Sequence, residues 1–102
     1  MKLPKSEKSL LKISEAIKAM AHPVRINILR LIFNNRSNKL SVKEIHEELD
    51  LNQPETSRHL SILKDKGVLC SEKKGSNVFY YLDKNNSIIT CIATCLAQYK
   101  KV

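Results

Sequence analysis

The sequence has little glycine and proline, with only two and three of them among its 102 residues. So few of these residues leave little room for long flexible linkers. No internal repeat or low-complexity tract is visible either. Apolar residues make up 42% of the chain and charged residues 27%, which is ordinary for a globular protein and argues against disorder. We therefore expect residues 1–102 to form a single domain.

Long apolar runs are also lacking. The first ten residues, MKLPKSEKSL, contain no apolar segment of the kind that a secretory signal needs. The longest uncharged stretch, residues 85–99, is shorter than the roughly 18 residues that a membrane-spanning helix requires. Three cysteines in a chain without an export signal fit reduced thiols better than a disulfide framework. Together these absences predict a cytoplasmic protein with no membrane association.

Acidic residues are scarce relative to basic ones. The chain has eighteen Lys and Arg and ten Asp and Glu, which gives a net charge of +8. Such a surplus favours a polyanionic partner, but it is +4 in each half of the chain and so does not locate a binding face. The sequence contains no Ser-His-Asp set, phosphate-binding loop or pair of acids placed for catalysis. We therefore expect no enzymatic activity.

Two amphipathic helices are predicted in the first third of the chain. The first covers residues 6–20, where apolar side chains recur at helical spacing. Pro23 then ends the first helix and suits the first turn of a second one. A polar loop over residues 34–38 follows the second helix. The apolar stripe of the first helix consists of Leu10, Ile13, Ile17 and Met20.

Residues 41–66 predict a helix-turn-helix. Residues 41–44 match a capping box that opens a first short helix. Asn52 can cap a second helix, and Gly67 suits the left-handed residue that would end it. Because only residues 50–52 separate the two helices, they must be joined by a tight turn.

The second helix of this pair has two different faces. Helical spacing directs Thr56, Leu60 and Leu63 toward a core and leaves Gln53, Ser57, Arg58 and Ser61 outside. Gln53 can pair with an adenine edge and Arg58 with a guanine. This outer face is therefore a candidate for reading DNA. The alternative is an ordinary solvated helix surface.

A β-hairpin and a last helix are predicted after Gly67. Two β-prone runs surround a polar tip over residues 68–83, and Lys73 and Lys74 at that tip could lie along DNA phosphates. An apolar stripe then predicts a helix over residues 85–100. The expected fold is mainly α, with about five helices and a two-stranded wing, in the order of a winged helix-turn-helix.

Three motifs in this frame resemble the ArsR/SmtB family of bacterial transcriptional repressors. They are A-x-x-H-P-x-R from Ala19, N-Q-P-E-T-S-R-H-L-x-x-L from Asn52, and G-S-x-x-x-Y-x-L from Gly75. The resemblance implies a homodimer, with helices 6–20 and 85–100 as dimerisation helices. It also implies that two recognition helices enter successive major grooves of a palindromic double-stranded DNA operator.

The resemblance also implies which residues touch DNA. In the recognition helix they would be Gln53, Thr56, Ser57 and Arg58, with His59 at the margin, and in the wing Lys73 and Lys74. Such a protein would repress transcription until a signal, which the sequence does not identify, released it. A winged helix that binds protein or RNA without operator specificity is the alternative.

The metal sites of that family are not matched, so no metal or other cofactor is predicted. Its thiolate site uses a C-x-C pair in the first helix of the helix-turn-helix, where this chain has no cysteine. Its C-terminal site needs histidines that are absent after Asp83. His22, His46 and His59 are isolated along the chain, which favours structural or surface roles over ligation.

The cysteines leave two alternatives open. Cys91 and Cys95 are one helical turn apart, so both thiols would lie on one face of the last helix. They could pack as small hydrophobic side chains. Alternatively, they could sense a soft metal or an oxidant, alone or with Cys70.

Overall fold

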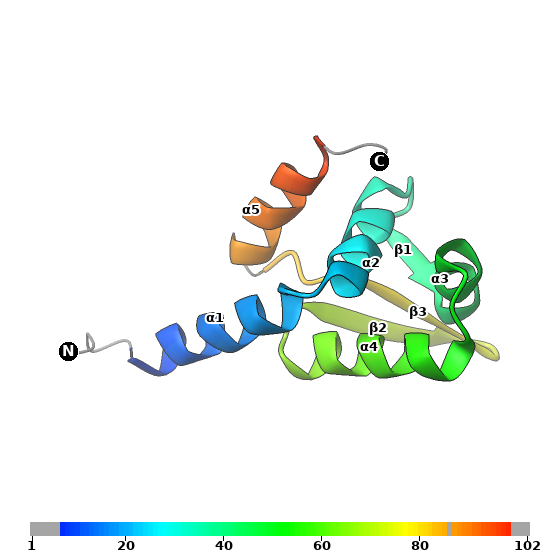
Figure 1. Ribbon diagram of the computed structural model, residues 1–102, viewed down its shortest axis with the longest axis horizontal. Helices are drawn as coiled ribbons and strands as arrows, with labels where there is room; N and C mark the ends of the chain where they lie inside the picture. Colours follow the sequence, from blue (N-terminus) through cyan, green and yellow to red (C-terminus); the bar gives the residue numbers. More distant parts are fainter. Residues whose placement is uncertain (1–6, 86, 99–102) are drawn as a thin grey trace.

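The computed structural model describes residues 7–85 and 87–98, and these residues form a winged helix-turn-helix (Figure 1). The predicted mainly α fold is confirmed, with five helices in the described residues. In chain order the elements are α1 (Glu7–Met20), α2 (Pro23–Asn34), β1 (Lys39–Ser41), α3 (Val42–Leu49), α4 (Gln53–Asp65), β2 (Leu69–Lys74), β3 (Asn77–Leu82) and α5 (Ser87–Leu96).

The sheet has three strands, not the two that the sequence predicted. β1 pairs antiparallel with β3, which in turn pairs with β2. β1 is only three residues long, too short for an alternating pattern to reveal it. The hairpin lies within the predicted residues 68–83, but its turn is shorter than predicted, because β2 and β3 pair up to Lys74 and Asn77 and only Gly75 and Ser76 lie between them.

Both helices of the helix-turn-helix begin at the predicted caps. At the start of α3 the Glu44 N–H donates to the Ser41 hydroxyl at 3.1 Å, and the Ser41 N–H donates to the Glu44 carboxylate at 2.9 Å. This is the predicted capping box. At the start of α4 the Glu55 N–H donates to Asn52 Oδ1 at 2.8 Å, and Gly67 follows the helix at a φ of 77°.

The turn between α3 and α4 depends on a left-handed residue that is not glycine. Asp50 has a φ of 55°, which a short polar side chain tolerates better than a bulky one. The Leu51 N–H then donates to the His46 carbonyl at 3.1 Å and the Asp50 N–H to the Glu47 carbonyl at 3.3 Å. These bonds satisfy the last carbonyls of α3 and turn the chain directly into α4.

The core lies around α2, which contacts each of the other four helices described. α5 lies against one side of α2, and α4 packs against another beneath the sheet (Figure 1). Burial of each large apolar side chain contributes about 1.5–3 kcal/mol. The large apolar side chains with less than 2% exposure are Ile28, Ile32, Ile45, Leu60, Leu63 and Val68.

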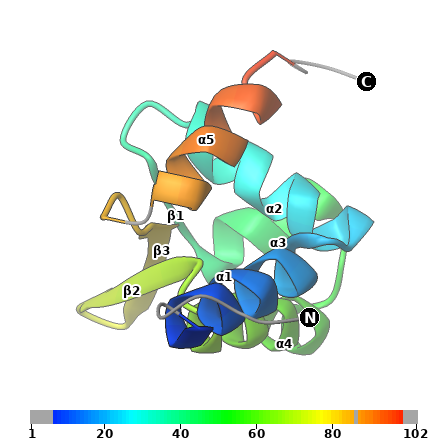
Figure 2. The ribbon, with the colours of Figure 1, turned by 90° about the vertical axis from the view of Figure 1, so that its left-hand side faces the viewer.

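α1 projects from this body (Figures 1 and 2), and several of its apolar side chains are exposed. The stripe predicted for this helix is divided, because Met20 is buried while Leu10 and Ile17 are 38% and 45% exposed. Leu11, at 55%, adds to the exposed apolar surface. Ala16 and Ala19 make the contact with the core instead.

The helices of residues 7–85 and 87–98 also include none that could cross a bilayer, because each is too short or too polar.

Candidate nucleic-acid interface

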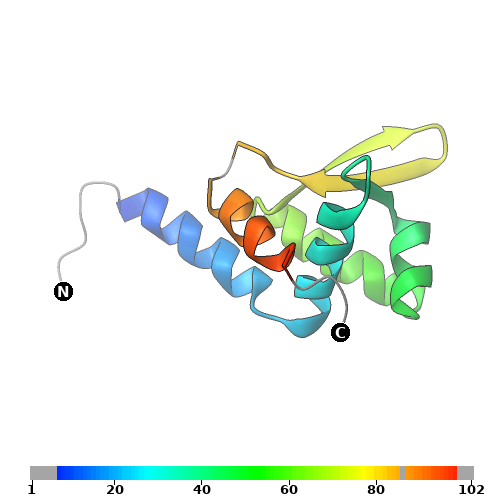
Figure 3. The ribbon, with the colours of Figure 1, turned by 90° about the horizontal axis from the view of Figure 1, so that it is seen from above.

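The predicted DNA-contacting segments lie at one end of the molecule. The turn of the wing and the amino end of α4 are both at the end opposite to the start of α1, in two perpendicular views (Figures 1 and 3). The start of α4 and the turn between β2 and β3, which are far apart in the sequence, therefore lie at the same end of the protein.

The outer face of α4 is open to solvent as predicted. Gln53 and Arg58 are exposed and Ser57 is half-buried, whereas Leu60 and Leu63 on the opposite face are fully buried. This face can therefore present donors and acceptors to base edges while the leucines hold the helix in place.

Thr56 corrects one predicted contact. Its side chain has no exposed surface, and its hydroxyl donates to the Asn52 carbonyl at 3.0 Å. The prediction that Thr56 touches DNA, which came from the family motif, is therefore wrong. Helical spacing alone had placed this residue on the core side of α4, and the structure agrees with the spacing.

His59 is engaged inside the protein. Arg25 Nε donates to His59 Nδ1 at 3.1 Å, and the His22 and His59 rings lie 5.0 Å apart between centroids, at 59°. Two histidines that are isolated along the chain therefore meet in space. Contacts with Arg25 and His22 therefore occupy part of the ring of His59, which the family motif places only at the margin of the predicted DNA contacts.

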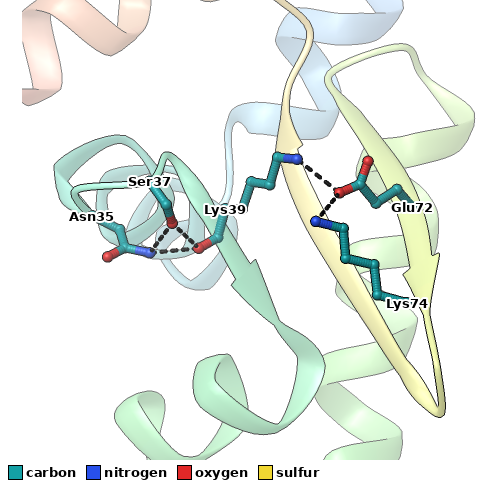
Figure 4. Close-up of polar contacts among 5 residues, drawn as sticks. All are labelled: Asn35, Ser37, Lys39, Glu72 and Lys74. Atoms are coloured by element: carbon teal, nitrogen blue, oxygen red, sulfur yellow. Dashed lines mark hydrogen bonds and ion pairs between the residues drawn. The ribbon is translucent and has the colours of Figure 1, made fainter.

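The wing carries both exposed lysines that the sequence predicted. Lys73 and Lys74 are exposed, and the Lys74 side chain keeps 69% of its surface in solvent. Lys74 Nζ lies 3.6 Å from a Glu72 carboxylate oxygen that also accepts from Lys39 Nζ at 2.7 Å (Figure 4). The hydrogen bond from Lys39 lowers the pKa of Glu72. Because Lys39 already neutralises this carboxylate, the Lys74 ammonium remains able to meet a phosphate.

A polar loop holds Lys39 in position for this contact. The Ser37 hydroxyl donates to the Lys39 carbonyl at 3.2 Å, and the Asn35 side-chain amide donates to the same oxygen (Figure 4). β1 then pairs Lys39 with Tyr81 of β3. The sequence did not predict this support of the wing, because β1, the strand that pairs with β3, is only three residues long.

Cys91 and Cys95 do not pack in the core of the single chain. In α5 the buried side chains are Ile89 and Ala93, while Cys91 and Cys95 are exposed. Burial raises the pKa of the half-buried Cys70 thiol, which makes it less reactive. In the described parts of the chain no three His, Cys, Asp or Glu side chains gather into a metal-binding group.

Comparison with known sequences agrees with this arrangement. A model of the arsR family of bacterial regulatory proteins matches residues 22–70. The chain is 39% identical over 83 residues to the uncharacterized HTH-type transcriptional regulator MJ1325 of Methanocaldococcus jannaschii, covering 79% of this chain and 91% of that protein. It is 37% identical over 82 residues to the transcriptional activator HlyU of Vibrio cholerae, with 80% and 73% covered. It is 29% identical over 85 residues to a biofilm growth-associated repressor of Agrobacterium fabrum, with 83% and 70% covered.

Solved structures show the same fold. The reduced form of HlyU from Vibrio cholerae N16961 superposes with a TM-score of 0.78 at 31% identity, covering 94% of this chain and 96% of that one. A homodimeric winged helix-turn-helix DNA-binding domain, Mb0332 of Mycobacterium bovis, gives a TM-score of 0.76 at 19% identity, with 94% and 84% covered. The second likeness concerns the fold alone.

The His59 contact predicts how stability depends on pH. Burial, followed by the positive charge of Arg25 and by His22, lowers the pKa of His59 from its ordinary value of 6.5. Below that pH the unfolded chain takes up a proton that the folded protein resists, so acid should destabilise the fold. Urea unfolding between about pH 8 and pH 5 should show this loss, and His59→Gln should show a shallower one. Equal slopes for the two proteins would contradict the prediction.

Proposed function

The chain belongs to the arsR family of bacterial regulatory proteins, and we propose that it is a repressor that binds a palindromic operator as a homodimer. It is a DNA-binding transcriptional regulator and not an enzyme. The observation that carries the proposal is that the start of α4 and the turn of the wing lie at the same end of the molecule (Figures 1 and 3), where α4 has an exposed polar face and the wing has exposed lysines.

Each part of that end has a different role in the proposed complex. Gln53, Ser57 and Arg58 would contact base edges in the major groove and so supply sequence preference. Lys73 and Lys74 would follow the phosphates of the neighbouring backbone and supply affinity that is independent of sequence. The acidic side chains of α3, Glu44, Glu47 and Glu48, are exposed, and their charge favours α4 as the inserted helix.

Dimerisation would use the apolar face that α1 leaves uncovered. Leu10, Leu11 and Ile17 are the exposed large apolar residues of this helix, and a soluble monomer gains nothing by exposing them together. α5 would add its outer face. Two copies related by a twofold axis would present two copies of α4, which is the symmetry that a palindromic site requires.

Repression is the sign of regulation that we propose. A dimer seated on an operator excludes other proteins from the same DNA without any further activity. Relatives carry both repressor and activator in their names, so the sign has to be tested on the regulated promoter itself. Deletion of the gene should raise transcription from the promoter that the purified protein binds, and a fall would reverse the sign.

Arg58→Ala and Lys74→Ala should affect DNA binding in different ways. Loss of the Arg58 guanidinium should cost about 1–3 kcal/mol on the preferred sequence and relax the choice of one base. Loss of the Lys74 charge should weaken all sequences alike and reduce the slope of log affinity against log salt by about one. Gel shifts at several salt concentrations measure both effects. The opposite pattern would mean that helix and wing have been exchanged, and binding independent of salt and sequence would favour a protein or RNA module.

Ile17→Glu should produce a monomer. A glutamate at this 45% exposed position would place an unpaired charge inside the proposed interface, which is costly when it is desolvated. Ile17→Met keeps the apolar surface and should remain dimeric. Sedimentation equilibrium measures the difference, and thermal unfolding checks that both variants fold. A dimeric Ile17→Glu protein would place the interface elsewhere.

A thiol sensor is the second candidate, and the exposure of Cys91 and Cys95 favours it. On this hypothesis a soft metal or an oxidant acts on the outer face of α5 and loosens the dimer. Cys91→Ser with Cys95→Ser should then bind DNA normally but keep it after arsenite or peroxide is added. Cys70→Ser serves as the control that still responds. Release of DNA by the double variant would remove the hypothesis.

A further inference from the structure

Arg25 lies where three helices meet. It is in the first turn of α2, and its Nε donates to His59 Nδ1 on α4 at 3.1 Å. Its Nη1 donates to the Ala19 carbonyl near the end of α1 at 3.3 Å. One guanidinium therefore connects the helix with the exposed apolar face to the helix with the exposed polar face. The fork of Arg is suited to this, because its donors are held in one plane.

The other partners of His59 support the same geometry. His22 precedes α2, and its Nδ1 accepts from the Val24 N–H at 3.2 Å, which caps the helix. That cap holds the His22 ring beside His59. Because His59 Nδ1 accepts from Arg25, the neutral ring carries its proton on Nε2. The remaining charged groups that face this ring are Glu55 and Arg58 on α4 itself.

We propose that Arg25 is a positioning residue for DNA reading, which fixes the orientation of α4 relative to α1 through His59 and the Ala19 carbonyl. The inference rests on the proposed function, in which α1 forms the dimer and α4 enters the groove. A dimer reads two half-sites only if its two α4 helices are spaced to match about one helical turn of DNA, or a multiple of it. The spacing between the two helices is set by every contact that joins α4 to the dimerising helix, and Arg25 makes such a contact directly.

This assignment gives a role to the A-x-x-H-P-x-R motif, which DNA contact alone does not explain. Ala19 supplies the carbonyl, His22 caps α2 and supports the His59 ring, and Arg25 supplies the donors. Pro23 occupies the first turn of α2, where its missing N–H costs nothing. The motif is thus a junction between α1, α2 and α4.

The test compares operator spacing rather than affinity alone. A half-site is first selected from a random duplex library with the wild-type dimer, and duplexes are then made with two half-sites at spacings that differ by one base pair. Arg25→Gln should bind the best spacing about tenfold more weakly, the size of one lost base contact, and should discriminate less between spacings. Lys84→Gln loses the same charge from the exposed turn before α5 and should keep the wild-type preference.

Variants of His59 separate positioning from a general loss of stability. His59→Phe removes the acceptor and should reproduce the Arg25→Gln pattern, while the double variant should be no worse than either single one. His59→Gln retains an acceptor oxygen and should restore the spacing preference at neutral pH. If Arg25→Gln does not fold, the two His59 variants, in which Arg25 is intact, provide the same comparison.

Two results would overturn the inference. Arg25→Gln and His59→Phe proteins that fold, dimerise and keep the wild-type spacing profile would show that the junction is only structural. A ¹⁵N spectrum of wild-type His59 in which Nδ1 of the neutral ring carries the proton would show that Arg25 does not donate to it in solution. A wild-type dimer that selects no sequence would instead refute the proposed function, and the inference with it.

Discussion

The structure depends on a helix that must bury one face and leave the other free. α4 buries Leu60 and Leu63 completely. These contacts hold the helix in place, because its outer face is open to solvent when DNA is not bound. Loss of either leucine would remove part of the buried surface that holds this helix in place, at a cost of about 2–5 kcal/mol in a well-packed core. The outer face is therefore free to vary in sequence without loss of fold, whereas the inner face is not.

The placement of charged side chains also favours DNA binding at the wing. The net charge of +8 is spread over the chain, so affinity for DNA has to come from where charges are placed and not from their number. At the wing, Lys39 occupies Glu72 through a 2.7 Å contact, which prevents the carboxylate from cancelling the exposed lysines beside it. The exposed pairs in this network contribute little to stability. Their value lies in the local field that the wing presents to phosphates.

Much of this fold could be predicted from the sequence because its signals are local. The capping box at Ser41, the cap at Asn52 and the left-handed Gly67 each act within one turn of a helix, so residue types and spacing were sufficient. β1 could not be predicted, because three residues form a strand only when β3 lies beside them. The site was predicted in part. The outer face of α4 follows from periodicity, whereas the burial of Thr56 and the contact between Arg25 and His59 depend on which helices pack together. The family motif implied a DNA contact for Thr56, whereas helical spacing directed it toward the core, where the structure has it.

The central position of α2 limits how any signal could reach DNA. α5, which carries Cys91 and Cys95, contacts α2, and α2 contacts α4. Ile28 and Ile32 of α2 are fully buried, and a close-packed core of this kind transmits a displacement and does not absorb it. A change at α5 can therefore act in two ways. It can shift α2 as a rigid body and move α4 with it, or it can alter the proposed dimer and change the distance between two unchanged α4 helices. The first route would change the contacts of Arg25 with α1 and α4, whereas the second would leave them unchanged. The contacts of Arg25 therefore distinguish the two routes.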